Sequence, residues 1–263
     1  MRAYFKEKEE ISKDFVHTCI ISADCDEETV RKAINKLVSY HDMLRGTFTE
    51  KGIEIIPTKE REVYSFKSIT IEDTDEAKEI LRDTKLEEDK LVHVTYCKTG
   101  KENLVSITVH HFLIDLISWE VLIKDFNTII NQIKNNEEYE LPAKTASFKM
   151  WREELQKYSE TMPEENREYW EKTNDKLNEA KSLHREKEEN EAEEYSYTFS
   201  EEISDKLINE VNDTYGTRTN EVLLTAVGLA AGKIAKGSVG IMVESHGRTE
   251  LHKAIAVERT VGW

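Results

Sequence analysis

Residues 104–134 constrain the fold most, because the hydrophobic period changes there from that of a strand to that of a helix. In residues 104–110, apolar side chains alternate with others and share one strand face: Val105, Ile107 and Val109. In residues 116–134 they recur every three or four positions and form one helical stripe: Ile117, Val121, Leu122, Phe126, Ile129, Ile130 and Ile133. A strand followed directly by a long amphipathic helix predicts a helix packed on a sheet.

Similar patterns divide the rest of the chain into further elements. Strands are expected at residues 15–22, 44–49, 53–56, 91–97, 195–199 and 239–244. Helices are expected after an N-cap at Asp26 and at residues 76–85, 148–158, 164–177, 203–215 and 220–235. This order of elements predicts an α+β fold with a mixed sheet and flanking helices.

A charged stretch divides the chain in two. Residues 181–194 are dense in charge and show no hydrophobic pattern, so they are interpreted as a linker or exposed loop. The predicted organisation is an N-terminal lobe at residues 1–180, this linker, and a second region at residues 195–263.

The charge balance excludes some partners. The formal net charge of −16, from 37 basic and 53 acidic side chains, argues against nucleic acid and against an anionic membrane surface. The three cysteines, Cys19, Cys25 and Cys97, lack metal-ligand spacing and are interpreted as reduced thiols. With a polar N-terminus and no apolar run long enough to span a membrane, a cytoplasmic protein is expected.

The sequence HHFLIDLISW at residues 110–119 carries the sharpest chemical signal. Adjacent side chains on a strand point to opposite faces, so one of His110 and His111 can face a given cavity while the other is structural. Histidine suits proton transfer near neutral pH, and Asp115 could cap the helix or pair with an arginine. A buried histidine pair before a capped helix is the plainer alternative. Zinc ligation and a serine nucleophile at Ser118 are weak alternatives, because the spacing and the glycine elbow they need are absent.

A second candidate group lies near the end of the chain. Glu244 follows the apolar residues 239–243, where a carboxylate would be partly desolvated and its pKa raised, although a solvent-facing glutamate is equally compatible. His246 and Arg248 could hold the loop around Gly247, or form a simple polar turn.

Residues 110–119 resemble the HHxxxDxxSW signature of epimerization domains in nonribosomal peptide synthetases. These domains belong to the condensation-domain superfamily, whose halves each resemble chloramphenicol acetyltransferase. Condensation domains usually carry glycine after the aspartate, where this chain has Leu116. The ending at Ser118 and Trp119 matches the epimerization form.

Three further segments match in the same order. Residues 41–48, HDMLRGTF, resemble the superfamily's RHxxLRxxF segment, with Tyr40 where an arginine is usual. Residues 244–248, ESHGR, are similar to the EGHGRE motif, with Ser245 in place of glycine and Thr249 in the last position. Residues 259–263, RTVGW, match the epimerization segment RTVGWF. The resemblance implies one chloramphenicol acetyltransferase-like lobe and the beginning of a second.

The resemblance also implies a reaction and its residues. An aminoacyl or peptidyl thioester on the phosphopantetheine arm of a peptidyl carrier protein would be epimerized at its α-carbon, with no cofactor bound by the domain itself. His111 would be one acid/base and Glu244 the other, across a tunnel between lobes, and no metal is implied. Structural roles fall to the remaining motif residues: His110, Asp115, Ser118, Trp119, Arg45, His246, Gly247 and Arg248. Arg45 and Arg248 are both candidate partners for Asp115.

Two other functions remain open at this point. One is a condensation-type acyltransferase that forms an amide bond, and the other is an inactive remnant that docks a carrier domain. Family domains continue past the TVGW point, so little or no activity is expected of a chain that stops at Trp263.

Overall fold

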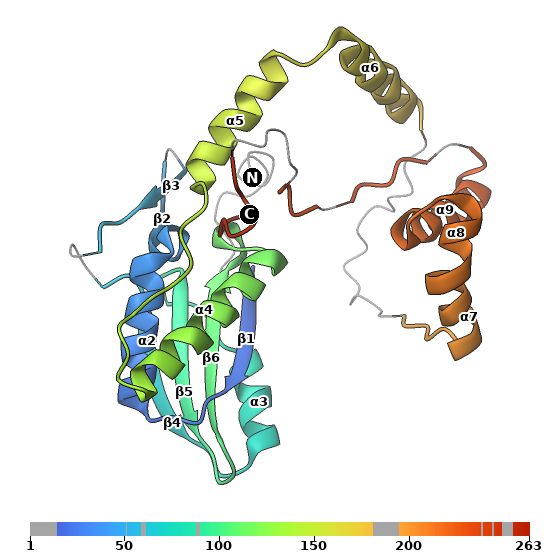
Figure 1. The fold of residues 1–263 in the computed structure, drawn as a ribbon. Coiled ribbons are helices and arrows are strands. Elements are labelled where there is room, and N and C mark those ends of the chain that lie inside the picture. The colour runs from blue at the N-terminus through green and yellow to red at the C-terminus, as the bar shows by residue number, and fades with distance from the viewer. Residues whose placement is uncertain are drawn as a thin grey trace. The chain divides into compact units, whose positions relative to one another are not determined.

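The computed structural model describes residues 15–50, 52–58, 62–87, 90–180, 195–237, 239–243, 245–248 and 255–263. The chain divides into two compact units (Figure 1). The first comprises Met1–Glu160 and His246–Trp263, and the second comprises Thr161–Ser245.

A mixed four-stranded sheet forms the centre of the first unit. Its strands are β1 (Val16–Ser22), β6 (Asn103–His110), β5 (Val92–Lys98) and β4 (Ser65–Thr70), in that order across the sheet. β1 and β5 run antiparallel to β6, whereas β4 runs parallel to β5. A separate hairpin joins β2 (Gly46–Thr49) to β3 (Gly52–Ile55). The predicted α+β fold with a mixed sheet is confirmed.

Two long helices cover one face of this sheet (Figure 1). α2 (Glu27–Tyr40) and α4 (Leu116–Lys134) bury their apolar stripes against the strand face that carries Val105, Ile107 and Val109. The shorter α3 (Thr74–Arg82) packs Ala77 and Leu81 on the other face. The predicted packing of the helix at residues 116–134 on the sheet is confirmed.

The short elements around this core explain most differences from the predicted boundaries. A 3-10 turn, η1 (Asp42–Arg45), replaces the first two residues of the strand expected at residues 44–49. A second 3-10 turn, η2 (His111–Leu113), separates β6 from α4. The helix α5 (Phe148–Glu160) is the last element of this unit before the chain enters the second unit. β4 was not predicted, because its sequence SFKSIT mixes polar residues into an edge strand and weakens the period-two signal.

The second unit is helical in the described residues. It contains α6 (Glu164–Glu179), the run α7 (Glu201–Asp205), η3 (Lys206–Glu210) and α8 (Val211–Tyr215), and α9 (Thr219–Ala235). The run contains a π-helical turn in its middle, and Gly216 ends it with φ 61°.

The strands expected at residues 195–199 and 239–244 are wrong over their described positions, which form neither strand. A strand needs a hydrogen-bonding neighbour, and the described part of this unit offers none. Tyr195 and Met242 are accordingly 87% and 99% exposed. The linker predicted at residues 181–194 lies outside the described residues.

The two units divide at residues 160 and 245, so α6 belongs with the second unit and residues 246–263 with the first. The lobe boundaries at residues 180 and 195 therefore stay a prediction. Over the described ranges, no helix combines the length and hydropathy needed to cross a bilayer.

Candidate active site

The two adjacent histidines have different environments: His110 is the last residue of β6, and His111 begins the 3-10 turn η2. His110 is buried among aromatic rings, with Phe48 edge-on at 5.0 Å and Phe112 at 5.1 Å between centroids. Its Nδ1 accepts a hydrogen bond from the backbone N–H of Phe112 at 3.2 Å, which caps the 3-10 turn. This environment agrees with the predicted structural role of His110.

His111 is held in one tautomer by the chain that follows it. Its Nδ1 lies 3.0 Å from the carbonyl oxygen of Ile114, which can only accept a hydrogen bond. Nδ1 therefore carries the proton, and in the neutral ring Nε2 keeps its lone pair. An imidazole fixed in this way is arranged to act as a base through Nε2.

Three rings surround the imidazole of His111, and this residue is only 9% exposed. Phe15 stacks on it at 4.6 Å and 16°, Trp263 lies at 4.6 Å and 48°, and His17 lies at 4.0 Å and 52°. Sequence reasoning missed Phe15 and His17. The register of β1 on β6, which places His17 opposite Val109 and so on the His111 face, was the missing information.

Asp115 is a structural carboxylate. Its side chain accepts from Ser118 N at 2.8 Å, while Asp115 N donates to Ser118 Oγ, so the two residues form the capping box of α4. Arg248 donates hydrogen bonds to both oxygens of the same carboxylate, from Nη1 to Oδ2 at 2.5 Å and from Nη2 to Oδ1 at 2.9 Å. Burial would raise the pKa of Asp115, but the hydrogen bonds from Arg248 and Ser118 outweigh it and leave the pKa below its ordinary value.

Arg248 also ties the end of the chain to the start of α4. It donates to the carbonyl oxygens of Thr260 at 2.8 Å and Gly262 at 3.2 Å. Ser118 Oγ in turn accepts from Gly262 N at 3.1 Å. These bonds set Trp263 against His111, so the motifs at residues 110–119, 246–248 and 259–263 meet in one place.

Arg45, the other predicted partner of Asp115, has a separate role. Its buried guanidinium donates to the carbonyl oxygens of Val38, Ser39 and Ile56 and to the carboxylate of Asp42. It therefore holds the turn between α2 and the hairpin, and Arg248 is the partner of Asp115.

A second buried carboxylate on α4 repeats the arrangement ten positions further along. Asp125 accepts from His41 Nε2 at 2.8 Å and from Arg259 Nη2 at 2.7 Å. Burial would raise the pKa of Asp125, but these two partners outweigh it and lower the pKa. His41 and Arg259 lie in the sequence motifs, whereas Asp125 was not predicted, because one aspartate among polar helix residues gives no signal of burial.

The remaining predicted residues lie around this centre. Trp119 is buried in the core, and Trp151 donates from Nε1 to the carbonyl oxygen of Gly247 at 3.1 Å. Gly247 has φ 65°, a conformation that favours glycine. His246 Nδ1 accepts from Arg248 N at 3.0 Å, and the loop role of His246 stays a prediction.

Glu244 lies outside the described residues, so its approach to His111 stays a prediction. The described residues before it, 239–243, form no strand, and Val243 is exposed. The expectation of a buried apolar strand ahead of Glu244 is therefore wrong.

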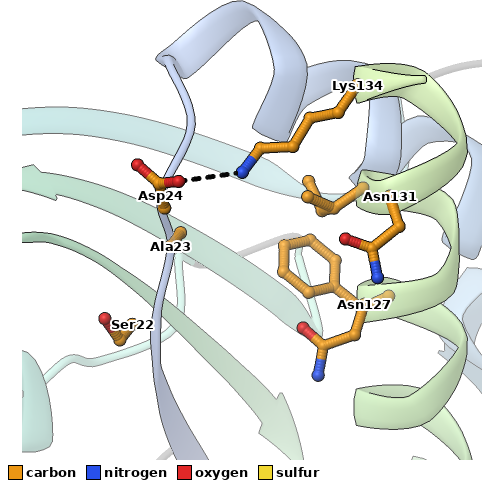
Figure 2. Close-up of a pocket in the computed structure, with 8 residues that line it drawn as sticks. Ser22, Ala23, Asp24, Asn127, Asn131 and Lys134 are labelled. Carbon is orange, nitrogen blue, oxygen red and sulfur yellow. Dashed lines mark hydrogen bonds and ion pairs between the residues drawn. The ribbon is translucent and has the colours of Figure 1, made fainter. Parts of the chain in front are cut away.

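A shallow hollow of about 190 Å³ lies elsewhere in this unit (Figure 2). The end of β1 and the C-terminal half of α4 line it, with Asp24 and Lys134 paired across it at 3.2 Å. It lies at the opposite end of β1 from His17 and contacts none of the motif residues. In the described part of the chain, no cluster of three or more histidine, cysteine, aspartate or glutamate side chains could hold a metal ion.

Comparison with known proteins agrees with this geometry. The site lies on an α+β unit in which a strand of a mixed sheet leads through a short 3-10 turn to a capped helix. Residues 2–263 match the family model "Condensation domain", so the chain belongs to the condensation-domain family.

Its curated relatives are peptide synthetases. The chain is 31% identical over 258 residues to tyrocidine synthase 2 of Brevibacillus parabrevis, a match that covers 90% of this chain and 7% of that protein. It is also 31% identical over 258 residues to gramicidin S synthase 1 of Brevibacillus brevis, covering 90% of this chain and 23% of that protein. The chain thus spans less than a quarter of the length of these relatives.

Two solved structures are similar over nearly the whole chain. The epimerization domain from the third module of tyrocidine synthetase B superposes with a TM-score of 0.72 at 25% identity, covering 95% of this chain and 61% of that one. The SgcC5 protein from Streptomyces globisporus gives 0.68 at 19% identity, covering 94% and 59%, and shows the shared fold alone. The similarity to the epimerization domain confirms the predicted α+β, condensation-domain fold.

Proposed function

We propose that this chain carries the histidine half of an epimerization domain, which inverts the α-carbon of an aminoacyl or peptidyl thioester on a carrier protein. The observation that carries the proposal is the fixed tautomer of His111. It leaves Nε2 without a proton and able to act as a base, in a ring that stacks on Phe15. The similarity to a solved epimerization domain at 25% identity supports it.

The chemistry follows from an acidic α-carbon next to a thioester. The α C–H bond breaks, its electron pair moves into the thioester as an enolate, and the proton goes to His111 Nε2. The resulting imidazolium lies against the face of Phe15, which stabilises a cation, and beside the tilted ring of Trp263. Return of a proton from the opposite face gives the inverted centre, and Glu244 is the proposed donor on that face. The phosphopantetheine arm of the carrier protein supplies the substrate, and no cofactor of the domain takes part.

Residues 116 and 118 favour epimerization over amide formation. Leu116 is 73% exposed, so packing does not require the glycine that condensation domains carry at this position. The ending at Ser118 and Trp119 matches the epimerization form, and Ser118 is fully buried and bonds Asp115, Arg248 and Gly262.

Solvent deuterium tests this function. A carrier domain is loaded with an aminoacyl phosphopantetheine thioester, and uptake of deuterium at the α-carbon is followed by mass spectrometry. The assay uses the chain itself and a chimera in which residues 1–263 replace the matching part of the tyrocidine synthetase B epimerization domain. His111→Gln should lower uptake by about 10²–10⁴-fold, whereas His93→Gln, a buried histidine on β5, should leave it nearly unchanged.

The outcomes separate the alternatives. Uptake that depends on His111, in either protein, supports epimerization. Amide formation with an added amine, without uptake, would assign the chain to condensation. No uptake and no amide in either protein would support a docking remnant.

A further inference from the structure

A buried carboxylate within α4 binds the segment that carries Trp263 to the candidate base. Asp125 is 1% exposed, and Arg259 donates from Nη2 to both of its oxygens, at 2.7 Å each. We propose that Asp125 and Arg259 are positioning residues for proton transfer at His111. Their ion pair fixes the segment at residues 255–263 and, through it, the position of Trp263. The catalytic part of this inference rests on the proposed function of His111, whereas the position of Trp263 can be measured without substrate.

The Asp125 carboxylate is a rigid anchor. Besides Arg259, it accepts a hydrogen bond from Nε2 of His41 at 2.8 Å. The backbone N–H of His41 in turn bonds the carbonyl oxygen of Leu37 at the end of α2, so the carboxylate is held from both helices. Among the described residues, Asp125 is the one group that the Arg259 guanidinium binds, and the Nε of Arg259 is buried without a hydrogen-bond partner. Loss of the carboxylate would therefore release this side chain.

Two anchors on α4 match the spacing of two residues on the segment. Ser118 and Asp125 are seven positions apart, which places them on one face of the helix about 10 Å apart. Ser118 Oγ accepts from the backbone N–H of Gly262 at 3.1 Å, and Gly262 is three residues from Arg259. Three residues of chain span at most about 10 Å. The segment therefore follows this face of α4, held by Asp125 at one end of the stretch and by Ser118 at the other.

Trp263 comes directly after this stretch and contacts the candidate base. Its ring stacks on Phe112 at 5.5 Å and 17°, and lies against His111 at 4.6 Å and 48°. The carbonyl oxygen of Ile114 fixes Nδ1 of His111, and the indole limits how far the imidazole can tilt. A catalytic base must keep its lone pair aimed at the reacting atom, since a displacement of about 1 Å can cost about 10²-fold in rate. A shift of the segment would thus change the aim of Nε2.

Other bonds keep the segment attached when the ion pair is lost. The side chain of Thr260 donates to the carbonyl oxygen of Ala146 at 2.6 Å, and Arg248 donates to the carbonyl oxygen of Thr260 at 2.8 Å. Removing the Arg259 charge should therefore shift the segment along α4 without detaching it. The effect is expected in the position of Trp263, beyond any loss of stability.

NMR of the full chain tests this position. Nuclear Overhauser cross-peaks between the rings of Trp263 and His111 should be present in the wild type and lost in Arg259→Gln. Arg259→Lys should keep them, because a single nitrogen makes both bonds to Asp125 and an ammonium can take its place. Glu258→Gln removes a charge from an exposed neighbour in the same segment and should also keep them.

The same variants in the chimera described above show whether the position matters to the reaction. Arg259→Gln should lower kcat for deuterium uptake about 10–100-fold and leave KM nearly unchanged, and Arg259→Lys should restore most of kcat. Ile129→Ala is the control for stability, because Ile129 is fully buried one turn beyond Asp125 and takes no part in the ion pair. It should lower stability and keep both the cross-peaks and kcat per folded molecule.

An apolar variant serves if Arg259→Gln does not fold. His41→Leu, Asp125→Leu and Arg259→Met together replace the three buried polar groups, a change that often preserves stability. This triple variant should fold and should show the same loss of cross-peaks and of kcat, because apolar packing does not fix the segment in one place.

The outcomes are distinct. Cross-peaks that persist in folded Arg259→Gln or in the triple variant would overturn the inference, and so would an equal loss in Ile129→Ala. If the cross-peaks are lost but no uptake depends on His111, the proposed function fails while the role of the ion pair in placing Trp263 stands. If uptake depends on His111 but kcat is the same in the wild type and Arg259→Gln, the ion pair has no part in the reaction.

Discussion

At the scale of single residues, the acid beside the candidate base serves the structure. Asp115 is fully engaged by Arg248, Ser118 and the helix N-terminus, and its lowered pKa keeps it charged at neutral pH. A carboxylate held in this way accepts no proton from substrate near neutral pH. His111, whose Nδ1 is bound to the carbonyl oxygen of Ile114 and whose Nε2 is not, is therefore the proposed acid/base.

Breaking the Asp115–Arg248 pair should destabilise the first unit strongly. Asp115→Asn and Arg248→Met each leave a buried polar or charged group without its partner, which costs about 3–5 kcal/mol. Urea unfolding followed by tryptophan fluorescence measures this loss. Lys134→Ala removes an exposed pair at the other end of α4 and should change stability by no more than about 0.5 kcal/mol. Equal effects of the two pairs would contradict the structural role of Asp115.

The residues of this site differ in how far the sequence predicted them. His110, His111 and Asp115 were predicted from local chemistry and motif spacing, since the strand and helix they join are strongly patterned. The choice between Arg45 and Arg248 stayed open, because it depends on contacts 133 positions apart along the chain. His17 depended on strand register, and Asp125 on burial, which a single sequence does not report.

At the scale of elements, the segment at residues 255–263 acts as a strap along α4. Arg259 binds Asp125, Arg248 binds the carbonyl of Thr260, and Gly262 binds Ser118. The strap can lie this close because Gly262 has φ 152° and no Cβ; an added Cβ would lie 2.4 Å from Phe148 Cδ2.

Gly262→Ala should therefore displace the strap and withdraw Trp263 from His111. Both the strained φ and the contact with Phe148 oppose the methyl group, so we expect a loss of about 2–3 kcal/mol. A change in tryptophan fluorescence and in the histidine NMR signals should accompany it. Gly237→Ala meets no atom within 4 Å and is the matched control. Retained stability and unchanged His111 signals in Gly262→Ala would show that the strap tolerates a side chain.

The helices and central strands were predicted well because their signals are local. α4 was predicted at its observed bounds, and α2 begins after Asp26, whose side chain accepts from Thr29 N at 2.8 Å. The strands expected at residues 195–199 and 239–244 were wrong over their described positions, because an apolar pattern indicates only that a strand is possible. A partner strand must also be present, and that is a property of the assembled sheet.

At the scale of the whole molecule, two buried carboxylates make the first unit sensitive to acid. Asp115 is the N-cap of α4 and Asp125 lies within this helix, and both bind arginines from residues 246–263. The folded pKa of each is lowered below its ordinary value, because their cationic partners outweigh burial. A lowered folded pKa means that the unfolded chain binds protons more readily than the folded chain.

The sign of the pH dependence follows directly. The stability that these carboxylates contribute is fully present above their unfolded pKa of about 4 and is lost as pH falls through the folded values. We therefore expect unfolding free energy that is nearly constant from about pH 7 to 5 and falls below about pH 4. Urea titrations at several pH values, with fluorescence of Trp119 and Trp151 in this unit, measure this pH dependence of the unfolding free energy.

The double variant Asp115→Asn and Asp125→Asn should be less stable at pH 7, and its unfolding free energy should fall much less steeply in acid. Asp75→Asn, whose exposed side chain lies in the first turn of α3, should keep the wild-type slope. If the double variant keeps the steep loss of unfolding free energy below pH 4, other carboxylates set the acid stability, and the Asp115–Arg248 and Asp125–Arg259 pairs do not.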